Sequence, residues 1–230
     1  MKSKVISRSR AATARSKHET PVSLSEQAYR EIKRLILRLK LKPGDYLNEA
    51  KLSETLGVGR TPVNRAVHRL SFEGLIQILP RKGLLVQPLS FDEVADLIDV
   101  RRLNEPYCAR CAAEHIDAAE LEALTGLLHR AAQAVERRDI DTVVDLDRTF
   151  HQILSRASRN KVLHEMLMQL HDRSQRFWTV SLSDVRHLEE IVPEHTAIIE
   201  ALKRRDAAGA ATAMEAHIES FSATMKRALR

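Results

Sequence analysis

The sequence predicts a mainly α-helical protein in two parts, an N-terminal winged helix-turn-helix domain and a C-terminal all-α bundle of six helices. Three observations favour this division: apolar residues at helical spacing over most of the chain, two short apolar runs near residue 80, and a change in the sign of the charge near residue 90. With 43% hydrophobic residues, 230 residues are enough to bury two cores. We expect a flexible basic tail at residues 1–20 and domains at residues 21–89 and 90–230.

The net charge of +6 is unevenly distributed along the chain. Residues 1–90 carry a net charge of +11, whereas residues 91–230 carry −5. An excess of cations confined to one small domain is typical of proteins that bind the phosphate backbone, because each neutralised phosphate releases counterions. A solvated basic surface would have the same composition, so charge alone does not decide.

No apolar run approaches the roughly 20 residues that a membrane span needs, and the basic N-terminus lacks the apolar core of a secretory signal. We therefore expect a cytoplasmic protein with no membrane partner. Cys108 and Cys111 are too close and too few for a disulfide framework, which fits a reducing compartment. Their CxxC spacing lies within a helix-patterned segment, so we interpret both as small core residues.

The N-terminal domain is expected to contain three helices followed by a β-hairpin. Apolar residues at helical spacing mark the helices, and glycine- and proline-containing turns separate them. Two short apolar runs flank Pro80-Arg81-Lys82-Gly83, which indicates a hairpin with a basic tip. The expected spans are about 24–39, 49–56 and 59–74 for the helices, and 75–79 and 84–87 for the strands.

The third helix begins with Gly59-Arg60-Thr61-Pro62, where we expect Thr61 to cap the first turn and Pro62 to fit within it. Its apolar residues lie on one side, so its polar and basic side chains project outward. In a winged helix-turn-helix this helix enters the major groove, and the hairpin tip meets the backbone or minor groove. Any one of these side chains is equally well explained as solvated surface, but the set favours DNA binding. The candidate contacts are Arg60, Thr61, Asn64, Arg65, His68 and Arg69, with Arg81 and Lys82 on the wing.

From Phe91 onward the sequence has almost no strand character and divides into six amphipathic segments. Asp147 and His151 lie four residues apart on one apolar stripe, and His195 and His217 each lie in a stripe that is otherwise apolar. The expected helices span about 91–115, 118–138, 140–157, 161–182, 185–205 and 207–229, with kinks or interruptions at Pro106 and Pro193.

Burying one carboxylate and three imidazoles is costly unless they pair or bind a cation. A lone buried histidine is more often a hydrogen-bonded core residue than a ligand, but the four residues together favour a metal site. They suit a borderline divalent ion such as Zn²⁺, Ni²⁺, Mn²⁺ or Fe²⁺. Arg101 lies on the inner stripe of the first bundle helix, where it would either bind a small carboxylate effector or form a salt bridge to Glu105 or to another helix.

The run PGDYLNEAKLSETLGVGRTPVNRAVHRLSFEGLI, followed by PRKGLLV, resembles the DNA-binding domain of the GntR family of bacterial transcription regulators over about residues 24–89. The family usually has Ser at the position of Gly59 and Arg-Glu at Asn64-Arg65. We therefore expect a shifted base preference.

The C-terminal half resembles the ligand-sensing FCD domain of the FadR-type branch of this family. The similarity lies in the runs DVRRLNEPYCARCAA, DRTFHQILSRASRN and PEHTAIIEALKRRDAAGAATAMEAHI. Six helices rather than seven are similar to the smaller, vanillate-regulator type, although Asn104 stands where the family usually has Leu. The resemblance places the family's metal ligands on Asp147, His151, His195 and His217, and its effector-contacting arginine on Arg101.

These observations favour a homodimeric transcription regulator, most often a repressor in proteins of this kind, and not an enzyme. It would bind a palindromic operator on double-stranded DNA and respond to a small organic acid bound at a metal-containing pocket. Two alternatives stay open. One is a metal-dependent hydrolase with Glu190 or Glu194 as base, which no strong catalytic motif supports. The other is an architectural DNA-binding dimer without an effector.

Overall fold

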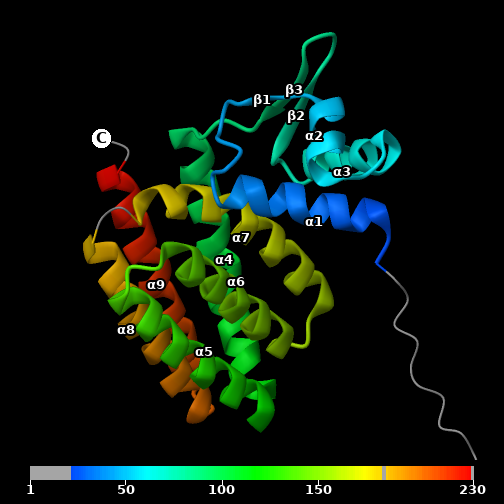
Figure 1. Cartoon of the computed structure of the whole chain (residues 1–230). Helices are drawn as coiled ribbons and strands as arrows, with labels where there is room; N and C mark the ends of the chain where they lie inside the picture. The colour runs from blue at the N-terminus through cyan, green and yellow to red at the C-terminus, as the bar shows by residue number, and fades with distance from the viewer. Residues whose placement is uncertain (1–21, 183–184, 229–230) are drawn as a thin grey trace, which may run out of the picture.

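The computed structural model describes residues 22–182 and 185–228, which form two parts joined along one helix (Figure 1). The smaller part contains three helices and a small sheet, whose hairpin points away from the rest of the molecule. The larger part is a bundle of helices, and α1 (Leu24–Leu37) lies along the junction between the two. The predicted fold class, a winged helix-turn-helix followed by a helical bundle, is confirmed. The expected basic tail lies outside the described residues.

Local capping interactions define the first two helices. The Ser23 side chain accepts a hydrogen bond from the backbone N–H of Glu26 at the start of α1. The Asn48 side chain likewise caps α2 (Glu49–Leu56), which ends at Gly57 with φ 63°. Because glycine adopts this left-handed conformation without steric cost, the chain turns directly into the next helix.

The third helix, α3 (Arg60–Phe72), begins before the residue expected to cap it. Its N-cap is Gly59, which is extended and makes no side-chain capping bond, so the prediction that Thr61 caps this helix is wrong. Thr61 and Pro62 are instead the second and third helical residues. Pro62 is tolerated there because the first four N–H groups of a helix have no partner within the helix.

The wing is a three-stranded antiparallel sheet in the order β1-β3-β2. In the hairpin, β2 (Ile76–Leu79) pairs with β3 (Gly83–Val86). A short strand that the sequence did not indicate, β1 (Tyr46–Leu47), pairs with the other edge of β3. Two residues are too few to show an alternating pattern, so only the pairing with β3 reveals this strand.

The smaller part has its own apolar core, formed by α1, α3 and the hairpin. Six of its side chains are completely buried at 0% exposure, and they come from all of these elements. They are Ile32, Ile36, Val63, Leu70, Leu75 and Val86.

The larger part contains six helices in the residues that the structure describes, and they agree with the expected spans to within two residues at each end. Pro106 and Pro193 lie inside continuous helices, so the interruptions considered there do not occur. No helix in this part, or in the rest of the described chain, is long and apolar enough to cross a membrane. The helices are α4 (Phe91–His115), α5 (Ala118–Glu136), α6 (Ile140–Ala157), α7 (Lys161–Ser181), α8 (Val185–Lys203) and α9 (Ala207–Ala228).

Both cysteines of α4 are free thiols. Cys108 packs against Leu163 and Leu167 of α7, and burial raises the pKa of its thiol to about 12. A thiol with this pKa is inert, as expected of a core residue. Cys111 is only half-buried.

Charged side chains connect the two parts across α1. Lys33 Nζ on α1 lies 2.5 Å from Asp172 Oδ2 on α7 and 2.7 Å from Glu73 Oε2, which follows α3 directly. Arg148 Nε of α6 approaches the other oxygen of Asp172 at 2.8 Å. These buried ion pairs therefore form a continuous chain from the bundle to the end of α3.

Helix α7 also holds the connection between the two parts. Arg176, whose side chain is completely buried, donates a hydrogen bond to the Gln87 carbonyl at 2.8 Å and pairs with Glu93 at 3.2 Å. Burial lowers the pKa of its guanidinium to about 10. The start of α4 is thereby fixed to α7.

The apolar core of the smaller part predicts a contrast between two residues of α3. Leu70→Ala should lower the free energy of unfolding by about 2–5 kcal/mol, because Leu70 is completely buried and its truncation leaves a cavity. Phe72→Ala should change it by less than about 0.5 kcal/mol, because Phe72 is 91% exposed. Urea unfolding of the full chain, followed by circular dichroism, measures both. Equal destabilisation by the two substitutions would contradict this packing.

Candidate metal centre and nucleic-acid interface

The four predicted metal ligands come together inside the bundle, although they lie on three helices. Each is at most 8% exposed. The side-chain ligand atoms of the three histidines all lie within 4.8 Å of one another. Asp147 and His151 come from α6, His195 from α8 and His217 from α9.

Asp147 lies at the centre of this cluster. Its Oδ1 is 3.4 Å from Nε2 of His195 and 3.8 Å from Nε2 of His151. These separations are longer than hydrogen bonds, and Nε2 of His195 has no hydrogen-bond partner among the described residues. The oxygen and nitrogen donors therefore converge without pairing with one another, which is what a metal-binding set requires.

Two of the imidazoles are held by neighbouring side chains. The ring of His195 stacks on Phe150, with centroids 4.0 Å apart and planes 4° apart. Nδ1 of His217 lies 2.8 Å from Glu194 Oε2, the distance of a hydrogen bond that the imidazole donates. This bond leaves Nε2 of His217 available as a ligand, an arrangement that is common around metal-bound histidines.

Sequence reasoning missed a further histidine in the cluster, His171 of α7. It is 6% exposed, and its Nε2 lies 3.5 Å from Asp147 Oδ2. The signal was present, since Leu163, Leu167 and His171 recur every four residues on one stripe. The inward position of His171 was harder to recognise from the sequence, because the same stripe continues through the polar Ser174.

Arg101 faces this cluster from α4, but it is not free. Its Nε donates a hydrogen bond to Glu105 Oε1 at 2.6 Å, and both side chains are at most 5% exposed. The guanidinium also lies over the ring of Phe221, 4.9 Å from the centroid. Glu105 Oε2 in turn lies 4.0 Å from Nδ1 of His151, so one carboxylate connects the arginine to the histidine cluster.

Burial controls the charge of these groups. It raises the pKa of Asp147 to about 7 and lowers that of His171 to about 4. Burial and the neighbouring imidazoles hold the pKa values of His151 and His195 well below their ordinary value. Burial also opposes ionisation of Glu105, but the adjacent Arg101 outweighs it and lowers the Glu105 pKa. Neutral imidazoles are the form that ligates metals.

The cavity among these side chains has a volume of about 20 Å³. That is room for one water molecule or ion rather than for an organic molecule. Its lining consists of Arg101, Asp147, His151, His171, Ser174, Gln175, Trp178, Ile191, Glu194, His217 and Phe221. An organic ligand can enter only if the surrounding helices move apart.

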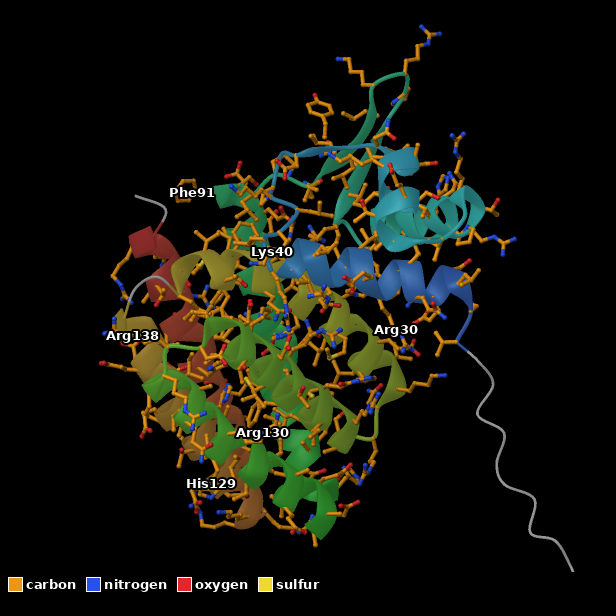
Figure 2. The ribbon with its side chains drawn as sticks, viewed as in Figure 1. Arg30, Lys40, Phe91, His129, Arg130 and Arg138 are labelled. Carbon is orange, nitrogen blue, oxygen red and sulfur yellow. The ribbon has the colours of Figure 1, made fainter. Side chains whose placement is uncertain are left out.

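The candidate DNA contacts lie on the smaller part. Four of them are exposed on the outer side of α3, namely Arg60, Thr61, Arg65 and His68. Side chains also project from the hairpin tip, away from the bundle (Figure 2), where Arg81 and Lys82 are exposed. The tip and the outer side of α3 together offer a basic surface that the bundle does not cover.

Asn64 and Arg69 of α3 have partners within the protein. Asn64 Nδ2 donates a hydrogen bond to Glu49 Oε1 at 3.1 Å. The Arg69 guanidinium lies 3.5 Å from the ring centroid of Tyr29 and pairs with Glu26 at 2.8 Å. Arg69 therefore turns toward α1, apart from the other candidate contacts.

Comparison with known families matches both parts of the chain. Residues 24–86 match the family described as bacterial regulatory proteins, gntR family, and residues 96–220 match the FCD domain. The chain belongs to the GntR family. The resemblance to a GntR regulator with an FCD domain is thereby confirmed.

Relatives in this family span nearly the whole chain. The HTH-type transcriptional repressor RspR of Escherichia coli is 30% identical over 204 residues, which cover 89% of this chain and 90% of RspR. The uncharacterised regulator YdhC of Bacillus subtilis is 26% identical over 93% of this chain and 96% of its own. These GntR relatives are described as transcriptional regulators.

Two solved structures have the same fold. McbR/YncC of Escherichia coli superposes with a TM-score of 0.83 at 24% identity, covering 91% of this chain and 100% of McbR. A GntR regulator of Rhodococcus sp. RHA1 gives 0.76 at 19% identity, over 90% of this chain and 99% of its own.

The buried cluster predicts a pH dependence of stability in metal-free protein. The imidazoles of His151, His171 and His195 have lowered pKa values when folded, so the unfolded chain binds more protons as the pH falls below the ordinary value of 6.5. Asp147 acts in the opposite direction, because its raised pKa lets the folded chain take up a proton below pH about 7. Since three groups outweigh one, stability should fall between pH 6.5 and about 4, by on the order of a few kcal/mol.

Urea unfolding after chelator treatment, repeated from pH 7.5 to pH 4.5, measures this dependence. His195→Phe should flatten it, because the substitution keeps a ring against Phe150 but removes a titrating group. His129→Gln, at an exposed position of α5, is the control. If the free energy of unfolding changes with pH equally in wild type and both variants, the buried cluster does not cause the pH dependence.

Proposed function

We propose that this GntR regulator binds a palindromic operator, and that a small organic acid bound at a metal-containing pocket of the FCD domain controls this binding. The observation that carries the proposal is the convergence of one carboxylate and three imidazoles in a domain whose charged contacts reach the DNA-binding part. Repression is the proposed outcome, supported by the name of the relative RspR.

The metal would be held by Asp147, His151, His195 and His217. Their donor atoms, their burial and the free nitrogen of His195 support this assignment. The donor set suits Zn²⁺, Ni²⁺, Mn²⁺ or Fe²⁺. When bound, such an ion supplies a Lewis-acid position for an oxygen of the effector.

Arg101 would bind the carboxylate of the effector. Its buried guanidinium faces the cavity, and guanidinium groups bind carboxylates in a two-pronged geometry. Because Glu105 already pairs with Arg101, an incoming carboxylate must share the guanidinium or displace Glu105. The effector would therefore change a buried ion pair when it binds.

The chain of ion pairs across α1 supplies a route from the pocket to the DNA-binding part. Asp172 follows His171, which faces the cluster, and it pairs with Lys33. Lys33 reaches Glu73, and the Tyr29 hydroxyl donates to the same carboxylate at 2.8 Å. An effector that moves α7 would thus change the contacts of Glu73 at the end of α3.

Homodimerisation is proposed through the exposed side of α4. Val100, Leu103 and Tyr107 recur at helical spacing and are 38%, 78% and 55% exposed. Val162 of the neighbouring helix α7 is 77% exposed. Apolar side chains gathered on adjacent helices indicate a surface that a partner covers, and a two-fold dimer would match a palindromic operator.

The two alternatives make different demands on the same pocket. A hydrolase needs a water-activating metal but has no use for a DNA-binding part, and residues 24–86 match the gntR family. An architectural dimer needs no connection between the pocket and α3, yet buried ion pairs run between them. The regulator is therefore the better supported proposal.

DNA binding is tested by replacing one exposed arginine in the DNA-binding part and one in the helical bundle. Arg65→Ala should weaken operator binding by about 1–3 kcal/mol, because Arg65 projects from the outer side of α3. Arg130→Ala removes the same charge from α5, far from α3, and should leave affinity unchanged (Figure 2). The operator is first obtained by selection from random duplexes, and affinity is then measured by fluorescence anisotropy. Equal operator affinities for wild type, R65A and R130A would contradict the proposal that α3 contacts the operator through Arg65.

Effector control is tested at Asp172. A panel of small mono- and dicarboxylates, added to metal-loaded wild type, should contain a member that changes operator affinity by about fivefold or more. Asp172→Asn should abolish that change, because it breaks the buried pair with Lys33. Asp145→Asn is the matched control, since it removes the exposed pair with Arg38 across the same junction.

Removing one partner of a buried pair also destabilises a protein, so a second variant is needed. The double substitution Lys33→Met, Asp172→Leu removes both charges and should fold, while still failing to respond to the effector. If no carboxylate alters wild-type affinity, effector control is wrong. If both junction variants respond like wild type, the route through Asp172 is wrong.

A further inference from the structure

The imidazole of His171 is buried, and its position suggests a role that its hydrogen bonds do not explain. It lies on α7, whereas the four predicted ligands come from α6, α8 and α9. Neither of its ring nitrogens has a hydrogen-bond partner among the described residues. Buried polar side-chain atoms are normally paired, because an unpaired one loses its bond to water and gains nothing in return.

The position of His171 fits a common ion with the other donors. Its Nε2 lies 3.5 Å from Asp147 Oδ2, and its ring centroid is 4.7 Å from that of His151. Two donors bound to one ion at about 2.1 Å are about 3.0 Å apart when adjacent and about 4.2 Å apart when opposite. The separations of Asp147 oxygens from the nitrogens of His171, His195 and His151, at 3.5, 3.4 and 3.8 Å, all lie within this interval.

His171 also occupies a side of Asp147 that the other histidines leave open. Oδ1 of Asp147 faces His195 and His151, whereas Oδ2 faces His171. The ligand atoms of Asp147, His151 and His171 lie within 4.8 Å of one another, as do those of the three predicted histidine ligands. The two groups share His151, so His171 and the predicted ligands are neighbours in one cluster around Asp147 and His151.

We propose that His171 is a fifth protein ligand of the divalent metal ion. The site is then one carboxylate and four imidazoles, and this inference rests on the proposed metal binding. A donor set so rich in nitrogen disfavours Mg²⁺ and Ca²⁺, which prefer oxygen. When Asp147 binds through one oxygen, the five protein ligands leave one position of a six-coordinate ion open, which the effector carboxylate would take through a single oxygen.

Cobalt(II) provides the test, because its visible absorption becomes stronger when its coordination number falls to four. Full-length protein is loaded with Co²⁺, and affinity is measured by competition with a chelator. His171→Leu should intensify the absorption and lower the affinity by about tenfold or more. His164→Leu is the matched control, because His164 lies on the same helix but bonds to Ser155 outside the cluster.

The outcomes separate this inference from the proposed function. Wild-type protein that binds Co²⁺, with an unchanged spectrum and affinity in His171→Leu, would overturn the fifth ligand and leave the four-ligand site intact. Wild-type protein that binds neither Co²⁺ nor Zn²⁺ would overturn both.

A measurement on the wild type removes any dependence on how the variant folds. Histidine-selective ¹⁵N labelling of the Zn²⁺-loaded protein reports each metal-bound imidazole by the chemical shift of its ring nitrogen. Four coordinated histidines are expected from the cluster. Three would overturn the assignment of His171.

Discussion

The burial of Asp147 among imidazoles is the constraint on which the rest of the bundle depends. A carboxylate and four histidines inside a helical core are removed from bulk water, so they need one another, an enclosed water or a cation. Their separations exceed hydrogen-bond lengths, and burial keeps Asp147 from ionising until about pH 7. The apolar core around these residues keeps the helices packed together despite the free-energy cost of burying the polar groups. The cluster is therefore poised for a cation, which would stabilise the ionised carboxylate and the neutral imidazoles together.

Helix α7 connects this cluster to the DNA-binding part through two consecutive residues. Successive side chains of a helix point in different directions, so His171 faces the donors while Asp172 faces α1. Lys33 depends on Asp172 and Glu73 together, because a buried ammonium without its partners is costly. Farther along α7, Arg176 holds Gln87 and Glu93 at the connection between the parts. One helix of the bundle therefore contacts the donor cluster, α1 and the connection between the two parts.

Hydrophobic periodicity predicted the helices of the bundle and the burial of Asp147, His151, His195 and His217, because a polar residue on an apolar stripe is visible in the sequence. Periodicity does not show which stripes meet, so the partners of Asp172 had to come from the structure. His171 was missed because its stripe is partly polar, and β1 because two residues have no period. The cap at Thr61 was wrong for a local reason, since an extended glycine begins α3 earlier. Tertiary pairing decided the partners of Asp172 and the presence of β1, whereas the cap of α3 was decided locally.

The closed cavity explains how such a pocket can act as a switch. A ligand shifts a conformational equilibrium only if it binds one state better than the other. A preformed pocket of full size would accept an organic acid without movement, and the DNA-binding part would then receive no signal. Here the free volume holds one water or ion, and Glu105 occupies the guanidinium that the acid needs. Binding of the proposed effector would therefore separate helices and rearrange a buried ion pair. The same closure would lower the affinity for the proposed effector and would allow that effector to change operator binding.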